Sequence, residues 1–159
     1  MLRKISVFIL LFAILVGLPL VGRPRDSGQA VNVDRKGYAA FGADVVAYRF
    51  LEQGDKAVKG TRDLSYEWKG AIWLFSTAEN LEAFRRDPEN YAPHYGGYCA
   101  NAMSQDILAE SDPNAWHLQD GELFLFNKKR GRNTWLDNST SNIGLADGNW
   151  PDHSERLTQ

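Results

Sequence analysis

The chain has 159 residues, of which 43% are hydrophobic and 24% are charged, and its formal charge is −2 at neutral pH. This length is enough for one domain with a substantial core, and the acidic balance argues against nucleic acid as a partner. Cys99 is the single cysteine, so the chain cannot form a disulfide within itself.

The first 30 residues have the pattern of an export leader. Arg3 and Lys4 precede an uncharged apolar run from Ile5 to Val21, which would span about 25 Å as a helix. That is slightly short for a bilayer core of about 30 Å, and the small residues in Gly28-Gln29-Ala30 suit a signal peptidase. We therefore predict either a cleaved signal peptide or an N-terminal anchor that contacts the membrane only through residues 5–21.

Both alternatives place the rest of the chain outside the cytoplasm, in the periplasm or the extracellular space. We predict a linker over residues 31–37, a folded domain over 38–151 and a polar tail over 152–159. Residues 1–30 hold four basic residues and one acidic residue, so the formal charge of the remainder is −5.

The first predicted elements are strands. Residues 45–50 are rich in β-branched and aromatic side chains between Gly42 and Gly54, which predicts a strand. Residues 64–68 and 71–75 flank Lys69-Gly70, a pair that suits a two-residue hairpin turn.

Two helices are expected next. Ser76 or Thr77 can cap a helix that Asp87-Pro88 ends, and Leu81 and Phe84 lie on one face of it. A second short helix is expected to begin near residues 95–98 and to run to about residue 105.

The last part of the chain predicts a second hairpin and more helices. Residues 116–118 and 122–126 flank Asp120-Gly121, and short helices are expected at residues 130–137 and 142–147, with Pro151 closing the ordered part. The connections are too short for crossover helices between parallel strands. We predict an α+β fold with a small antiparallel sheet of hairpins and short helices packed on it.

Several segments resemble the YHS domain family, in their order and spacing, from about Tyr38 to Trp150. The resemblance is to its exported single-domain branch, the YHS domain-containing (seleno)proteins. The segments are Gly42-Ala43-Asp44-Val45-Val46-Ala47-Tyr48, Gly70-Ala71-Ile72-Trp73-Leu74-Phe75-Ser76-Thr77, Asn80-Leu81-Glu82-Ala83-Phe84, Asp87-Pro88-Glu89-Asn90-Tyr91-Ala92-Pro93, Tyr95-Gly96-Gly97-Tyr98-Cys99-Ala100, Asp120-Gly121-Glu122-Leu123-Phe124-Leu125 and Ala146-Asp147-Gly148-Asn149-Trp150-Pro151.

The chain departs from this family at one set of positions. Short YHS domains resemble treble-clef zinc knuckles, and their cysteine positions align here with Ser76, Asn80 and Tyr48 or its neighbours. A structural zinc site needs four Cys or His ligands, whereas the chain has one cysteine and three histidines. The zinc knuckle is therefore not expected.

Cys99 is either an inert buried thiol or a thiol kept for chemistry. The resemblance favours chemistry, because relatives in this branch resemble the chain in having Cys or selenocysteine at this position. The preceding Gly96-Gly97 allows a tight turn and a close approach to a ligand. We expect Cys99 in the first turn of a helix, whose N-terminus would lower the pKa of the thiol.

Four further residues accompany Cys99 as site candidates. His94 is a candidate base and metal ligand, and His117 is a weaker candidate ligand. Together with Cys99 they would suit copper or another soft metal ion. Tyr95 and Tyr98 flank the glycines and either line a pocket or pack in the core. Asp44 is expected to cap a turn.

Three functions follow from these candidates. In the first, Cys99 binds a soft, copper-type metal ion or a thiol partner protein, as the metal-handling relatives suggest. In the second, Cys99 is the nucleophile of a thiol oxidoreductase that uses an external resolving thiol. In the third, the domain is a binding or accessory module without chemistry. A dimer linked through Cys99 is compatible with the first two.

Overall fold

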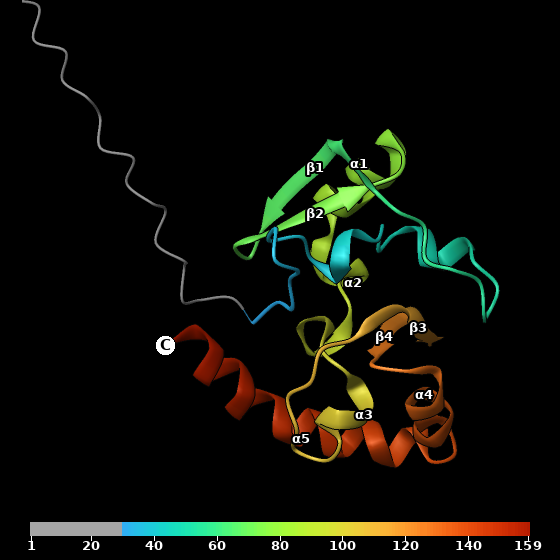
Figure 1. The fold of residues 1–159 in the computed structure, drawn as a ribbon, viewed down its shortest axis with the longest axis vertical. Coiled ribbons are helices and arrows are strands. Elements are labelled where there is room, and N and C mark those ends of the chain that lie inside the picture. The colour runs from blue at the N-terminus through green and yellow to red at the C-terminus, as the bar shows by residue number, and fades with distance from the viewer. Residues whose placement is uncertain (1–29) are drawn as a thin grey trace, which may run out of the picture.

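The computed structural model describes residues 30–159, so the leader predicted over residues 1–30 lies outside it apart from Ala30. The chain forms two antiparallel hairpins with helices around them (Figure 1). In chain order the elements are the 3-10 helices η1 (Ala40–Gly42) and η2 (Ala47–Phe50), strands β1 (Thr61–Trp68) and β2 (Ala71–Phe75), helices α1 (Ala78–Arg86) and α2 (Pro88–Tyr91), the 3-10 helix η3 (His94–Gly97), helix α3 (Ala100–Met103), strands β3 (Asp112–Gln119) and β4 (Glu122–Phe126), and helices α4 (Lys129–Leu136) and α5 (Ser139–Thr158).

Both predicted hairpins are confirmed. β1 pairs antiparallel with β2, and β3 pairs antiparallel with β4. Lys69-Gly70 and Asp120-Gly121 have positive φ at both residues, the conformation that a two-residue hairpin turn requires. The predicted α+β class is confirmed, with the strands in two separate two-stranded sheets.

The Thr77 side chain caps α1 by accepting a hydrogen bond from the Asn80 amide, as the sequence predicts. Other helix boundaries differ from the prediction. α5 continues through Pro151 to Thr158, so the expected end of order at Pro151 is wrong. Contacts on both sides of the proline hold this helix against the loop after α3: Asn149 donates to the Met103 carbonyl, and His153 lies 2.9 Å from an Asp106 oxygen.

The strand predicted at residues 45–50 is absent from the described structure, where this segment forms a turn and η2. The cause is Asp44, whose carboxylate accepts hydrogen bonds from the amides of Val46 and Ala47. This local bonding bends the backbone and overrides the β-propensity of the sequence.

Two hydrophobic clusters form the core, and the β3–β4 hairpin lies between them. Trp116 and Leu125 point into the cluster under β1–β2, while Phe124 and Phe126 point into the cluster against α3, α4 and α5. The hairpin is therefore buried on both faces, because successive strand residues face opposite sides.

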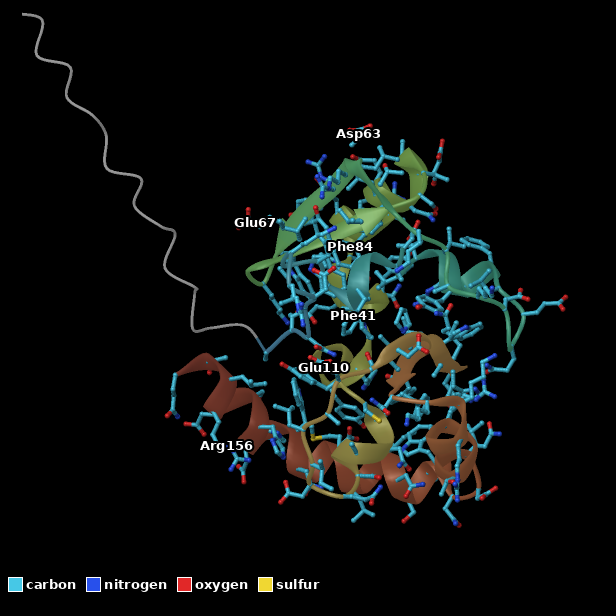
Figure 2. The ribbon with its side chains drawn as sticks, in the orientation of Figure 1. Phe41, Asp63, Glu67, Phe84, Glu110 and Arg156 are labelled. Carbon is cyan, nitrogen blue, oxygen red and sulfur yellow. The ribbon has the colours of Figure 1, made fainter. Side chains whose placement is uncertain are left out.

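The β1–β2 hairpin packs on α1 through one face. Phe84 of α1 is fully buried beneath it, whereas Asp63 and Glu67 project outward from β1 (Figure 2). Among residues 30–159, no helix has the length and apolar character needed to cross a membrane.

Candidate functional site

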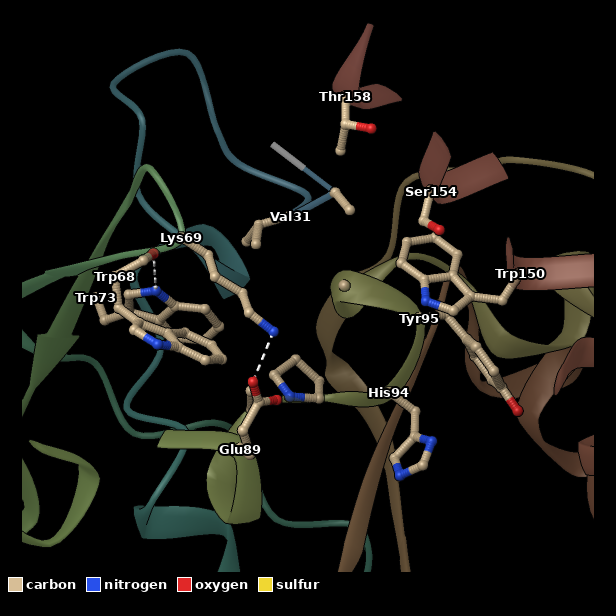
Figure 3. A pocket seen from close by; sticks show the side chains of 14 residues that line it. Val31, Trp68, Lys69, Trp73, Glu89, His94, Tyr95, Trp150, Ser154 and Thr158 are labelled. Atoms are coloured by element: carbon tan, nitrogen blue, oxygen red, sulfur yellow. Dashed lines mark hydrogen bonds and ion pairs between the residues drawn. The ribbon is translucent and has the colours of Figure 1, made fainter. Parts of the chain in front are cut away.

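A pocket of about 610 Å³ lies where the β1–β2 turn, α2, η3 and the end of α5 meet (Figure 3). Its walls carry four aromatic side chains: Trp68, Trp73, Tyr95 and Trp150. Pockets for small organic ligands commonly measure about 300–1,000 Å³ and have mostly apolar walls with a few polar groups. The volume of this pocket lies within that range, and its walls combine aromatic side chains with polar and charged groups in similar proportion.

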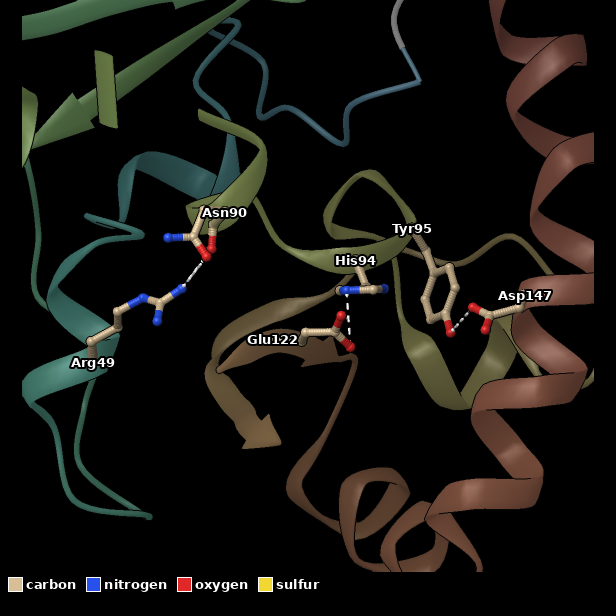
Figure 4. Close-up of polar contacts among 6 residues, drawn as sticks. All are labelled: Arg49, Asn90, His94, Tyr95, Glu122 and Asp147. Carbon is tan, nitrogen blue, oxygen red and sulfur yellow. Dashed lines mark hydrogen bonds and ion pairs between the residues drawn. The ribbon is translucent and has the colours of Figure 1, made fainter. Parts of the chain in front are cut away.

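The aromatic walls are held in place by hydrogen bonds. The Trp73 indole N–H donates to the Trp68 carbonyl at 3.0 Å, and Trp73 is only 2% exposed. The Tyr95 hydroxyl donates to Asp147 of α5 at 2.9 Å (Figure 4). Burial, followed by this bond, raises the pKa of Tyr95 above its ordinary value, so the hydroxyl keeps its proton. The pocket is thus preformed.

One ion pair lies within the pocket. The Lys69 Nζ lies 2.7 Å from Glu89 Oε1, and the same Nζ lies 4.5 Å from the centroid of the Trp68 ring. Both charged side chains are largely exposed, at 52% for Lys69 and 71% for Glu89. Such exposed pairs contribute about 0–1 kcal/mol, so this one can open at little cost.

The predicted glycine turn borders the same pocket. Tyr95, Gly96 and Gly97 all have positive φ, and a Cβ on Gly96 would lie 1.8 Å from the Ala30 carbonyl oxygen. The close approach that the sequence predicts at these glycines is therefore made by the chain itself. The Asn32 amide fixes this crossing by donating to the Gly96 carbonyl at 2.8 Å.

Cys99 lies away from this pocket, in the core cluster with Phe124 and Trp135, and is 4% exposed. The prediction that it lies in the first turn of a helix is wrong. Its backbone is extended at the N-cap of α3, and its amide donates to the Ala109 carbonyl at 2.9 Å. Cys99 is therefore paired with another segment of the same chain instead of forming part of a helical turn. The thiol borders a hollow of about 480 Å³ between α3 and α4.

The two histidine candidates have other neighbours. The His94 ring stacks on Phe124 with centroids 4.6 Å apart, and its Nε2 lies 3.4 Å from Glu122 (Figure 4). His117 Nδ1 lies 2.7 Å from Gln53 Oε1. Burial, with a smaller contribution from Arg132, lowers the pKa of His117 below its ordinary value. The side chain of His153, which lies in the predicted polar tail, is 11% exposed, and its Nε2 lies 2.9 Å from Asp106.

Copper or another soft metal ion is the cofactor that the sequence suggested, and it does not fit this arrangement. Residues 30–159 contain no cluster of three or more His, Cys, Asp or Glu side chains that could hold a metal ion. Around Cys99 the hollow presents the amides of Asn101, Gln105 and Asn127 rather than imidazoles or further thiols. Soft metal ions select thiolate, thioether and imidazole ligands.

The remaining candidates divide between the pocket and the core. Tyr95 and Gly96 line the pocket, and Tyr98 packs beside Trp150 at 6.2 Å between ring centroids. Sequence reasoning did not single out Lys69, Glu89 or Trp150 as binding residues. The sequence indicated the position of Trp68 and Lys69, because both adjoin a predictable hairpin turn. It gave no indication that Trp150, which lies far away in the sequence, borders the same pocket.

The fold is that of a small α+β domain with a cavity lined in part by aromatic side chains. Residues 54–95 match the family model of the YHS domain. The match supports the predicted resemblance to the YHS domain over residues 54–95, which is part of the predicted extent. It includes Trp68, Lys69, Trp73 and Glu89 of the pocket and ends before Cys99. The comparisons with curated proteins and with solved structures gave no match.

Proposed function

We propose that the protein is an exported, non-catalytic YHS-domain module that binds a small organic ligand in the pocket between β1–β2, η3 and α5. The single observation that carries this proposal is the preformed aromatic pocket of about 610 Å³. Its aromatic side chains offer large rigid contact areas at little entropic cost. Its polar groups, chiefly Lys69 and Glu89, supply orientation.

The export component rests on the sequence. An uncharged run from Ile5 to Val21 follows two basic residues, the pattern of a secretory leader. In this proposal the domain works in the periplasm or outside the cell, as members of the exported branch are expected to do.

The test is a binding screen with the domain over residues 31–159, carried out by calorimetry against organic cations, carboxylates and sugars. We expect at least one class to bind, and Trp150→Ala to weaken that binding at least about tenfold through loss of a stacking wall. Phe50→Ala is the matched control, because Phe50 is 80% exposed and does not line the pocket.

A second wall variant guards against misfolding of Trp150→Ala. Ala92→Phe leaves Trp150 in place and adds a bulky side chain at another residue of the lining, and it should also abolish binding. If no class binds, or if binding survives both wall variants, the proposed function is wrong.

A second candidate concerns Cys99, and the hollow beside the thiol favours it. In this alternative Cys99 binds a copper-type metal ion or a partner thiol, with the remaining ligands or the resolving thiol supplied from outside the chain. A dimer linked by a Cys99–Cys99 disulfide is one form of it.

The reaction rate of Cys99 with a thiol reagent separates these roles. Because the side chain is 4% exposed, we expect the folded protein to react at least about tenfold more slowly than the unfolded protein. Cys99→Ser provides the blank. Fast reaction that copper(I) blocks would support metal binding instead, and fast reaction that copper(I) leaves unchanged would support thiol redox chemistry.

A further inference from the structure

We infer that the ligand of the aromatic pocket is a small organic cation of the quaternary ammonium class; this rests on the proposed function and specifies its ligand. The inference starts from Lys69, whose ammonium lies inside the pocket between an aromatic face and a carboxylate (Figure 3). The pocket thus already contains a site that accepts a cation.

The geometry of that site is defined by two contacts. The Lys69 Nζ lies 4.5 Å from the Trp68 ring centroid, which is within the range of about 6 Å for a cation–π interaction. It also lies 2.7 Å from Glu89 Oε1. An aromatic face combined with a carboxylate is the arrangement that stabilises a desolvated cation.

Lys69 is a cation that a ligand can displace. The side chain is 52% exposed, and its partner Glu89 is 71% exposed, so the ammonium can return to water without an unpaired buried charge. Once Lys69 has moved out, the carboxylate of Glu89 remains and gives the cation site a negative charge. The formal charge of −5 over residues 31–159 also attracts a cation.

The remaining walls favour a cation that carries alkyl groups. Trp68 and Trp150 are half-buried and present aromatic surface to the pocket, whereas Trp73 and Tyr95 lie behind its walls and are almost fully buried. Contact with aromatic surface favours a methylated ammonium, because it loses less hydration energy on binding than a primary ammonium does. A carboxylate ligand would be repelled by Glu89. Apart from His94, Lys69 is the one basic residue of the lining, and it is already paired with Glu89. Glu122 lies beside His94.

The experiment compares choline with its neutral tert-butyl analogue, which has the same shape without the charge. Both are titrated into the domain over residues 31–159 by calorimetry. We expect choline to bind about two- to fivefold more tightly than the analogue, the ratio that a solvent-exposed cation–π contact supports. Equal binding of the two compounds would overturn the inference.

Two variants locate the cation site. Glu89→Gln should weaken choline binding at least about threefold and leave the analogue unchanged, because only the carboxylate is lost. Lys69→Asn should strengthen choline binding, since it removes the internal competitor. Asparagine followed by Gly70 also suits the positive φ of this turn, so the hairpin is kept. Weaker choline binding in Lys69→Asn would contradict the inference.

Failure of this inference differs from failure of the proposed function. If sugars or carboxylates bind in a Trp150-dependent manner and choline does not, the pocket is a ligand site for another class, and only the cation inference is wrong. If no compound binds, both are overturned.

Discussion

Asp44→Asn is expected to lower the free energy of unfolding by about 3–5 kcal/mol, a range set by the loss of several buried hydrogen bonds to a charged group. Asp44 is fully buried, and its two carboxylate oxygens accept five hydrogen bonds. One oxygen accepts from the amides of Val46 and Ala47. The other accepts from the amide and hydroxyl of Ser76 and from the side-chain amide of Asn80.

Asparagine is the informative replacement because it has the same shape and keeps one acceptor. The asparagine NH2 group would replace one of the two carboxylate oxygens and would face the donors that bond to it. At least two donors would then lack an acceptor. Urea denaturation followed by tryptophan fluorescence measures the change. A loss below about 1 kcal/mol would show that the donors find other acceptors.

Asp34→Asn is the matched control. Asp34 also accepts two backbone hydrogen bonds in a turn, from Lys36 and Tyr38, but both go to the same oxygen. Asparagine keeps that oxygen, so the expected change is within about 0.5 kcal/mol. The comparison separates a carboxylate that caps one turn from one that joins two parts of the chain.

The Asp44 cluster involves two positions that the family resemblance aligns with cysteines of the zinc knuckle. Ser76 and Asn80 align with two cysteine positions of the short YHS domains that the chain resembles. In this chain both residues donate hydrogen bonds to Asp44. In this chain a buried carboxylate therefore joins the segment before η2 to the β2–α1 junction. Asp44 was predicted to cap a turn, and it does so for Val46 and Ala47.

Local signals in the sequence predicted those elements that local interactions determine. Lys69-Gly70 and Asp120-Gly121 set the hairpin turns, and Thr77 caps α1, each through contacts within a few residues. The prediction of a strand over residues 45–50 failed where local and distant contacts act together. The segment over residues 45–50 is bent around Asp44, which Ser76 and Asn80 hold from more than 30 residues away.

The candidate site was harder to predict for the same reason. The Tyr95-Gly96-Gly97 motif correctly marked an unusual turn, and it borders the pocket. Its partners Trp68, Glu89 and Trp150 come from separate elements, and no spacing in the sequence brings them together. Cys99 attracted attention as a lone thiol, yet the packing of Phe124 and Trp135 around it depends on tertiary structure.

Gly60→Ala is expected to destabilise the domain by about 3 kcal/mol, at the upper end of overpacking costs. A Cβ at Gly60 would lie 2.3 Å from the carbonyl carbon and 2.5 Å from the carbonyl oxygen of Leu74, within the backbone of β2. Side chains can rotate away from a clash, but a paired strand cannot. The hydrogen bond from the Gly60 amide to the Gly42 carbonyl, at 3.0 Å, would be strained as well.

The control is another glycine-to-alanine change, Gly144→Ala. Gly144 lies within α5, and a Cβ there meets no atom within 4 Å. Alanine has the higher helix propensity, so this variant should gain about 0.5–1 kcal/mol. Opposite signs for the same chemical change, measured by thermal unfolding, would establish that backbone contact at Leu74 requires glycine at position 60. If Gly60→Ala is neutral, the segment before β1 can move away from β2 without cost, and the close packing of the two backbones contributes nothing to stability.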